Sequence, residues 1–147
     1  VNDYVDRVIP AFCHRSLKDL PLKVEGVGNV FDFTFVDNVA SGILKLINLL
    51  TENPKKHVPT IHLTTGRGVS LLEAAKIIIK RSNSRSNIVE SNPRQYDVTS
   101  FYGSVDRAKE LLGWSHDLDF EEAIDKFLLR LKEYSAPSPS RVFGVET

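Results

Sequence analysis

The sequence predicts a mixed α/β fold in which short strands alternate with amphipathic helices. Residues 31–35 alternate apolar and polar side chains with the period of a half-buried strand. Residues 120–131 instead repeat apolar side chains at helical spacing, directly after Asp119 and close to Glu122, a pair with capping-box spacing. With 41% hydrophobic residues, the 147-residue chain can bury one core. We therefore expect a single domain of about two or three strands and four or five helices.

The first third of the chain is predicted to contain two strands and two helices. Residues 5–17 favour a short helix that breaks near Pro10, and residues 21–25 favour a brief strand before a glycine-rich turn. The alternating strand leads into a helix with Asp37 as its N-cap, and this helix ends before Asn53. The apolar stripe of this helix consists of Val39, Ile43, Leu46, Ile47 and Leu50.

The middle of the chain repeats the order strand, glycine turn and helix. Residues 60–64 favour a further strand, and Gly66 and Gly68 follow it. Ser70 and Glu73 are three residues apart, which predicts a capping box at the start of the next helix. The side chains of that helix expected to face the core are Leu72, Ala75, Ile78 and Ile79.

Loops and two more helices are predicted for the remainder. Residues 82–87 favour a loop, 88–89 a short extended piece, and 92–97 a surface segment. Ser104 is expected to cap a helix that Gly113 ends in the left-handed conformation, with Trp114 packed just beyond it. The last helix is amphipathic, through Phe120, Ala123, Ile124, Phe127, Leu128 and Leu131. Residues 1–134 are thus the predicted structured region, and the Ser/Pro-rich residues 135–147 are predicted to be a flexible tail.

Composition argues against several classes of function. The chain has 19 Lys+Arg and 19 Asp+Glu residues, so no net field favours nucleic acid or an anionic membrane. No apolar run approaches the roughly 20 residues that a membrane-spanning helix needs. Cys13 is the single cysteine, and no Cys/His group has zinc-ligand spacing, so neither a disulfide nor a metal site is expected. A cytoplasmic location fits this cysteine usage.

Several segments in order resemble the C-terminal half of the nucleotide-sugar epimerase/dehydratase family of extended short-chain dehydrogenases. They are RVIPAF (7–12), PL (21–22) with GVG (26–28), DFTFVDNV (32–39), IHLTTG (61–66) with VSLLE (69–73), and AKELLGW (108–114). Each piece is common in folded proteins, but the ordered set at matching intervals is specific. The resemblance covers about residues 7–130, and it implies the C-terminal portion of a Rossmann-type fold.

The resemblance also implies a missing N-terminal half. That half would bind NAD or NADP through a glycine-rich turn and would carry a Tyr with a Lys four residues later. The tyrosines Tyr4, Tyr96, Tyr102 and Tyr134 have no Lys at that offset. The turn at Gly66 and Gly68 lacks the third glycine and the downstream acid of a dinucleotide fingerprint. We therefore assign no catalytic and no cofactor-binding residue to this chain, and we expect the N-terminal half, and a second copy of the chain, as its protein partners.

By the same resemblance, this chain would bind the nucleotide-sugar substrate. Arg94 and Asp97 have the Arg-x-x-Asp spacing of the family's nucleotide-diphosphate contact, with a guanidinium for phosphate oxygens and a carboxylate for ribose hydroxyls. Leu22, Lys23 and Val24 correspond to the strand that runs beside the base, offering backbone groups and an apolar wall. Phe31 is a departure, because family members usually have an arginine there. The absence of that arginine removes about 1.5–3 kcal/mol of potential binding free energy, the contribution of one charge-assisted contact.

Other readings of these residues remain open. Asp32 and Asp37 fit turn and capping roles better than acid/base catalysis. The four histidines lie in different elements, and Cys13 is expected to be a buried apolar filler. One alternative function is a non-catalytic interaction or regulatory module that kept the fold and lost the ligand. Another is a dehydrogenase of the same superfamily acting on a sterol or other small molecule, which would not need the Arg94 and Asp97 contact.

Overall fold

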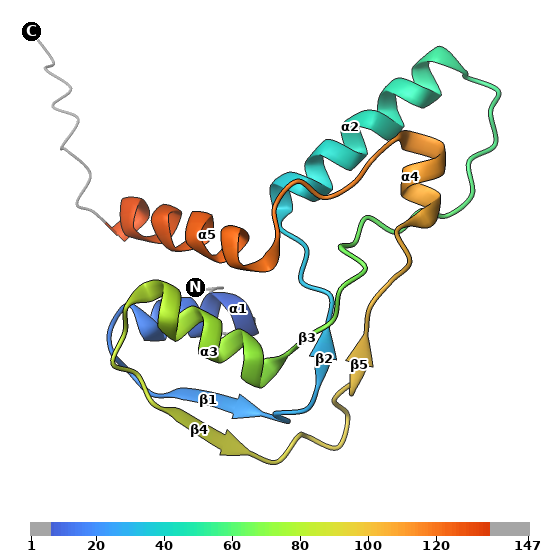
Figure 1. The fold of residues 1–147 in the computed structure, drawn as a ribbon. Coiled ribbons are helices and arrows are strands. Elements are labelled where there is room, and N and C mark those ends of the chain that lie inside the picture. The colour runs from blue at the N-terminus through green and yellow to red at the C-terminus, as the bar shows by residue number, and fades with distance from the viewer. Residues whose placement is uncertain (1–6, 136–147) are drawn as a thin grey trace, which may run out of the picture.

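The computed structural model describes residues 7–135, which form five helices and five short strands (Figure 1). In chain order these are α1 (Val8–Ser16), β1 (Leu22–Glu25), β2 (Val30–Phe31), α2 (Val36–Glu52), β3 (Val69–Ser70), α3 (Leu71–Ser82), β4 (Ile88–Ser91), β5 (Ser100–Phe101), α4 (Asp106–Leu112) and α5 (Phe120–Ser135). The predicted tail lies outside the described residues, except that Ser135 is the last residue of α5.

The main core lies between a parallel strand pair and three helices. β1 and β4 run side by side, with Leu22 opposite Ile88 and Glu25 opposite Ser91. Figure 1 shows α1, α3 and α5 over this pair, and α3 contacts both α1 and α5. The core consists of Phe12, Cys13, Leu22, Val24, Val69, Leu71, Ala74, Ala75, Ile78, Phe120, Ile124 and Leu128. Phe120, Ile124 and Leu128 of the face predicted for α5 lie in this core, as helical periodicity requires. On α3 the prediction is confirmed for Ala75 and Ile78 but wrong for Leu72, whose place in the core is taken by Leu71.

The predicted strand at 31–35 is wrong beyond Phe31. β2 covers Val30–Phe31, between antiparallel β3 and parallel β5, and neither β3 nor β5 was predicted from the sequence. After β2 the aromatic residues pack on α5 instead of continuing a ladder. The rings of Phe33 and Phe120 are 5.6 Å apart, and the guanidinium of Arg130 lies 5.1 Å from the ring centre of Phe35. The period-2 pattern reflects this aromatic packing.

The strand predicted at 60–64 is also wrong, because these residues form no strand within the described part of the chain. The segment runs beside α2, where Gly42 permits a close approach. A Cβ atom at position 42 would lie 2.6 Å from a methyl carbon of Leu63. A side chain there would therefore require the Leu63 side chain to shift.

Helix starts were predicted with mixed success. α1 is unbroken, because Pro10 falls in its first turn, where no N–H is needed. α2 begins at Val36 with Phe35 as its N-cap, so the prediction of Asp37 as N-cap is wrong. Asp37 instead accepts ion pairs from Lys126 and Arg130 of α5, each at 2.8 Å. α4 has Val105 as N-cap, one residue after the predicted Ser104.

Other capping predictions are confirmed. Of the capping box predicted for Ser70 and Glu73, the N-cap bond is present: the Ser70 hydroxyl accepts the Glu73 N–H at 3.1 Å, while the Glu73 carboxylate pairs with Arg67. The Asp119 and Glu122 carboxylates each accept the other residue's backbone N–H, at 2.9 and 3.0 Å. Gly113 has a φ of 55° and ends α4 in the left-handed region, which glycine adopts without steric cost.

α2 and α4 lie at the far end of the molecule from α1 and α3 (Figure 1). Trp114, which is 1% exposed, packs there as predicted and joins the end of α4 to α2. Three residues of the stripe predicted for α2 are left exposed: Ile43, Ile47 and Leu50 are 48%, 52% and 39% exposed, whereas Val39 and Leu46 are half-buried. None of the helices within residues 7–135 has the length and apolarity that crossing a membrane requires.

Candidate functional site

A cavity of about 780 Å³ lies between α1, the edge of β1 and the segment after β4. This volume is in the range of small-molecule sites. The charged residues that line it are Arg7, Arg15, Lys23, Glu25, Arg94 and Asp97. Phe12, Leu20, Phe31, Leu71, Tyr96 and Val98 supply apolar and aromatic surface. The cavity therefore combines apolar walls with converging charges, four of them cationic.

β1 divides its residues between the core and this cavity. The side chains of Leu22 and Val24 are fully buried in the core, whereas Lys23 and Glu25 line the cavity. The N–H of Leu22 donates to Asn87 at 2.9 Å and that of Gly26 to Ser91 at 3.0 Å, so the even-numbered backbone groups face β4. The expected apolar wall from Leu22 and Val24 is therefore wrong. Of the three residues, Lys23 presents its side chain to the cavity and its backbone to the edge of β1 with which no other strand of residues 7–135 pairs.

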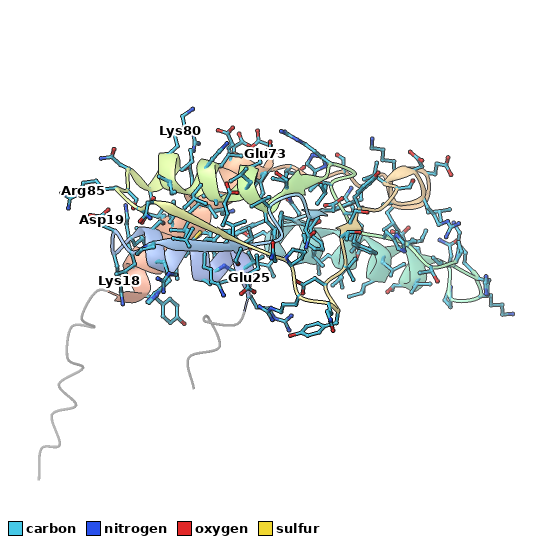
Figure 2. The ribbon with its side chains drawn as sticks, turned by 90° about the horizontal axis from the view of Figure 1, so that it is seen from below. Lys18, Asp19, Glu25, Glu73, Lys80 and Arg85 are labelled. Atoms are coloured by element: carbon cyan, nitrogen blue, oxygen red, sulfur yellow. The ribbon has the colours of Figure 1, made fainter. Side chains whose placement is uncertain are left out.

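Arg94 is held by Glu25, and both side chains line the cavity. Its Nε and Nη2 atoms lie 2.8 and 2.7 Å from Oε2 of Glu25, and Lys23 pairs with Oε1 of the same carboxylate. Hydrogen bonds from Lys23 and then from Arg94 hold the pKa of Glu25 below its usual value. The pKa of Arg94 is raised by the Tyr96 side chain and by Glu25. Figure 2 shows Glu25 on the opposite side of the molecule from Glu73 and Lys80 of α3.

Asp97 forms a turn with Arg94, which explains their spacing. Its Oδ2 accepts the Arg94 N–H at 2.9 Å, and its own N–H donates to the Arg94 carbonyl at 3.1 Å. This turn holds both residues at the cavity, and Oδ1 of Asp97 has no hydrogen bond among residues 7–135. The structure thus brings together Lys23, Arg94 and Asp97 of the predicted site.

Sequence reasoning missed Arg7, Glu25 and Tyr96 as lining residues. Glu25 could have been found, because strand alternation places it on the same face as Lys23. Arg7 directly precedes α1, and only the packing of α1 against β1 brings it to the cavity. Cys13 is confirmed as a buried residue, and burial raises the pKa of its thiol to about 12.

The glycine turn at Gly66 does not fit the pyrophosphate of a dinucleotide. Its N–H groups are already used: Thr65 N and Gly66 N donate to the Asp32 carboxylate at 2.9 and 2.8 Å. The hydroxyls of Thr65 and Thr34 donate to the same carboxylate at 2.8 and 3.1 Å. Asp32 therefore has the turn-stabilising role expected of it, and an anionic ligand would be repelled from this turn.

Replacing Asp32 by alanine is expected to lower the free energy of unfolding by about 1–3 kcal/mol, since the part-buried N–H of Thr65 and the exposed N–H of Gly66 both lose a charged acceptor. The measurement is urea denaturation followed by far-ultraviolet circular dichroism. Asp117→Ala is a matched control, because Asp117 is exposed and no hydrogen bond of its carboxylate is found among the described residues. Equal midpoints for the two variants would contradict the role of Asp32.

The chain is similar in sequence to enzymes that act on UDP-sugars. UDP-glucuronic acid decarboxylase 2 of Arabidopsis thaliana is 27% identical over 139 residues, which are 94% of this chain and 28% of the relative. UDP-glucose 4-epimerase 3 of Oryza sativa subsp. japonica is 31% identical over 91 residues, 62% of this chain and 24% of the relative. The chain spans between 24% and 39% of the length of such curated relatives. No protein-family model matches it.

Solved structures give the same result for the fold. UDP-glucose 4-epimerase of Thermotoga maritima, solved with UDP-glucose, matches 87% of this chain and 40% of its own with a TM-score of 0.77 and 23% identity. UDP-glucuronic acid 4-epimerase of Bacillus cereus, solved with UDP-glucuronic acid and NAD, matches 88% of this chain and 41% of its own with a TM-score of 0.76 and 17% identity. The predicted α/β fold class and the resemblance stated from the sequence are both confirmed.

Proposed function

Because the chain matches the C-terminal part of NAD-dependent nucleotide-sugar epimerases and dehydratases, we propose that it binds the nucleoside diphosphate of a nucleotide sugar. The observation that carries the proposal is the cavity beside β1. Four cationic and two anionic side chains line it, so it keeps a positive balance suited to a diphosphate. The free edge of β1 at Lys23 can hydrogen-bond a base, and Oδ1 of Asp97 can accept from a ribose hydroxyl.

The chemistry of such an enzyme would take place in another part of the protein. In this proposal an N-terminal half holds NAD or NADP, which exchanges a hydride with the sugar, and supplies the Tyr/Lys pair. The residues of this chain hold the nucleotide, which positions the remote sugar ring against that half. Binding energy from the non-reacting part of a substrate lowers the barrier in this way.

The exposed stripe of α2 is the surface proposed to meet the N-terminal half. Ile43, Ile47 and Leu50 are too exposed for a finished core, and the neighbouring residues 60–64 have strand-forming composition without a strand partner among residues 7–135. The extended segment could add a strand to an open sheet of the N-terminal half, and α2 could cover one face of that strand. The separated chain is expected to associate with itself through this surface.

An interaction module remains the alternative to a nucleotide site. Two observations favour it: Phe31 provides no charge, and Glu25 occupies the guanidinium of Arg94. An anionic ligand would have to compete with that carboxylate.

Calorimetric titration of the 147-residue chain with UDP, dTDP and GDP tests the proposal. Arg94→Ala should weaken binding of the preferred nucleotide severalfold, because it removes a cation from the cavity and leaves the Glu25 carboxylate with Lys23 alone as its partner. Arg85→Ala is a matched control, because Arg85 pairs with Asp19 at 3.0 Å at the other end of the β1–β4 pair (Figure 2). Binding of none of the three nucleotides would support the interaction module instead.

A further inference from the structure

The cations of the cavity are not equally available to a ligand. Lys23 and Arg94 both pair with Glu25, and Arg15 donates its Nε to the carbonyl of Pro21 at 2.6 Å. Within residues 7–135, the Arg7 side chain has neither a hydrogen bond nor an ion pair. Phe31 also lines the cavity, but its ring centre lies 6.1 Å from that of Phe33 and its side chain has no charge.

We propose that Arg7 is the main diphosphate contact of this chain and that Glu25 holds Arg94 back from that role. This inference rests on the proposed nucleotide site and assigns its charges. A diphosphate binds most readily to a cation that is not already paired. Lys23 and Arg94 are paired with Glu25, whereas Arg7 has no such partner among residues 7–135. Arginine also suits the ligand, because its planar guanidinium can bind two phosphate oxygens at once.

The position of Arg7 in the fold supports this assignment. Arg7 has an extended backbone, with φ −111° and ψ 131°, immediately before α1. Val8, Ala11 and Arg15 line the same cavity at helical spacing, so one face of α1 forms its wall. The side chain of Arg7 therefore starts at the N-terminal end of that wall, on a different element from the Arg94–Asp97 turn.

Glu25 determines which end of the cavity holds the phosphates. One of its oxygens accepts two bonds from Arg94 while the other pairs with Lys23, so a single carboxylate neutralises much of the charge on the β1 side. The uncompensated positive charge lies on the α1 side. A nucleotide would accordingly place its diphosphate toward Arg7 and its nucleoside toward Lys23 and Asp97.

The test compares UDP with uridine on the 147-residue chain by calorimetric titration. Arg7→Gln is expected to weaken UDP binding about tenfold, as the loss of one charge-assisted contact does, and to leave uridine binding unchanged. Arg7→Lys should lie between wild type and Arg7→Gln, because it keeps the charge without the planar fork. Glu25→Gln should strengthen UDP binding severalfold by releasing Arg94. Arg85→Gln is the control for a lost surface charge.

The outcomes separate the two proposals. Wild-type binding of UDP with unchanged affinity in Arg7→Gln would overturn the assignment of Arg7 and leave the nucleotide site standing. Equal losses of UDP and uridine affinity in Arg7→Gln would also overturn it, because a purely structural role would affect both ligands. No binding of UDP by the wild type would refute the nucleotide site and this inference together. Circular dichroism of each variant verifies that α1 is retained.

Discussion

Replacing Trp114 by alanine is expected to lower the free energy of unfolding by about 3–5 kcal/mol, the usual range for a buried large aromatic residue. The side chain is 1% exposed, and its indole N–H donates to the Asn38 carbonyl at 3.1 Å and to the Ser41 hydroxyl at 2.8 Å. These contacts join the end of α4 to α2 across more than 70 residues of sequence. Alanine would leave a cavity at this junction and would remove the donor.

The measurement for Trp114→Ala is urea denaturation followed by circular dichroism, since the variant lacks the chain's single tryptophan. Trp114→Phe keeps an aromatic ring and loses the N–H, so it should cost less than alanine. Tyr134→Ala is the exposed control, because Tyr134 is 88% exposed. A loss of under about 1 kcal/mol in Trp114→Ala, the range of surface changes, would show that α2 and α4 do not depend on this side chain.

Replacing Leu22 by alanine is expected to cost about 2–5 kcal/mol of stability. Leu22 is fully buried in the core that α1, α3 and β1 share, and its backbone N–H belongs to the β1–β4 ladder. The neighbouring Lys23 is the matched control, because its side chain is 63% exposed. Lys23→Ala should change the free energy of unfolding by no more than about 0.5 kcal/mol.

The two β1 variants also separate stability from binding. Urea denaturation gives the stability of each, and titration with UDP gives the binding. Leu22→Ala should lower the denaturation midpoint, whereas Lys23→Ala should weaken UDP binding at an unchanged midpoint. If Lys23→Ala were the less stable of the two, β1 would present the opposite face to the core.

Features predicted correctly from the sequence depend mainly on neighbouring residues. The Asp119 and Glu122 carboxylates each reach a backbone N–H three residues away. The left-handed stop at Gly113 depends on that residue's own φ. The α5 face that includes Ile124 and Leu128 follows from helical periodicity.

Errors arose where tertiary contacts override a local pattern. The alternation at residues 31–35 matches a strand, yet Phe33 packs on α5 with its ring 5.6 Å from that of Phe120. Asp37 has the composition of an N-cap, but two cations of α5 bind it. A local sequence pattern does not show which helix will pack against a segment. Neither the packing of Phe33 on α5 nor the ion pairs of Asp37 could therefore be predicted from it.

The sequence by itself determined the α/β class, the positions of the helices and of the β1–β4 pair, the resemblance, and the candidate pair Arg94 and Asp97. Only the tertiary structure decided that Lys23 lines a cavity while Leu22 and Val24 are buried, and that Glu25 holds Arg94 from 69 positions away. The physical reason is the distance along the chain over which each interaction acts. Backbone periodicity and capping act over about four residues. The partner of a charge is set by the packing of distant elements.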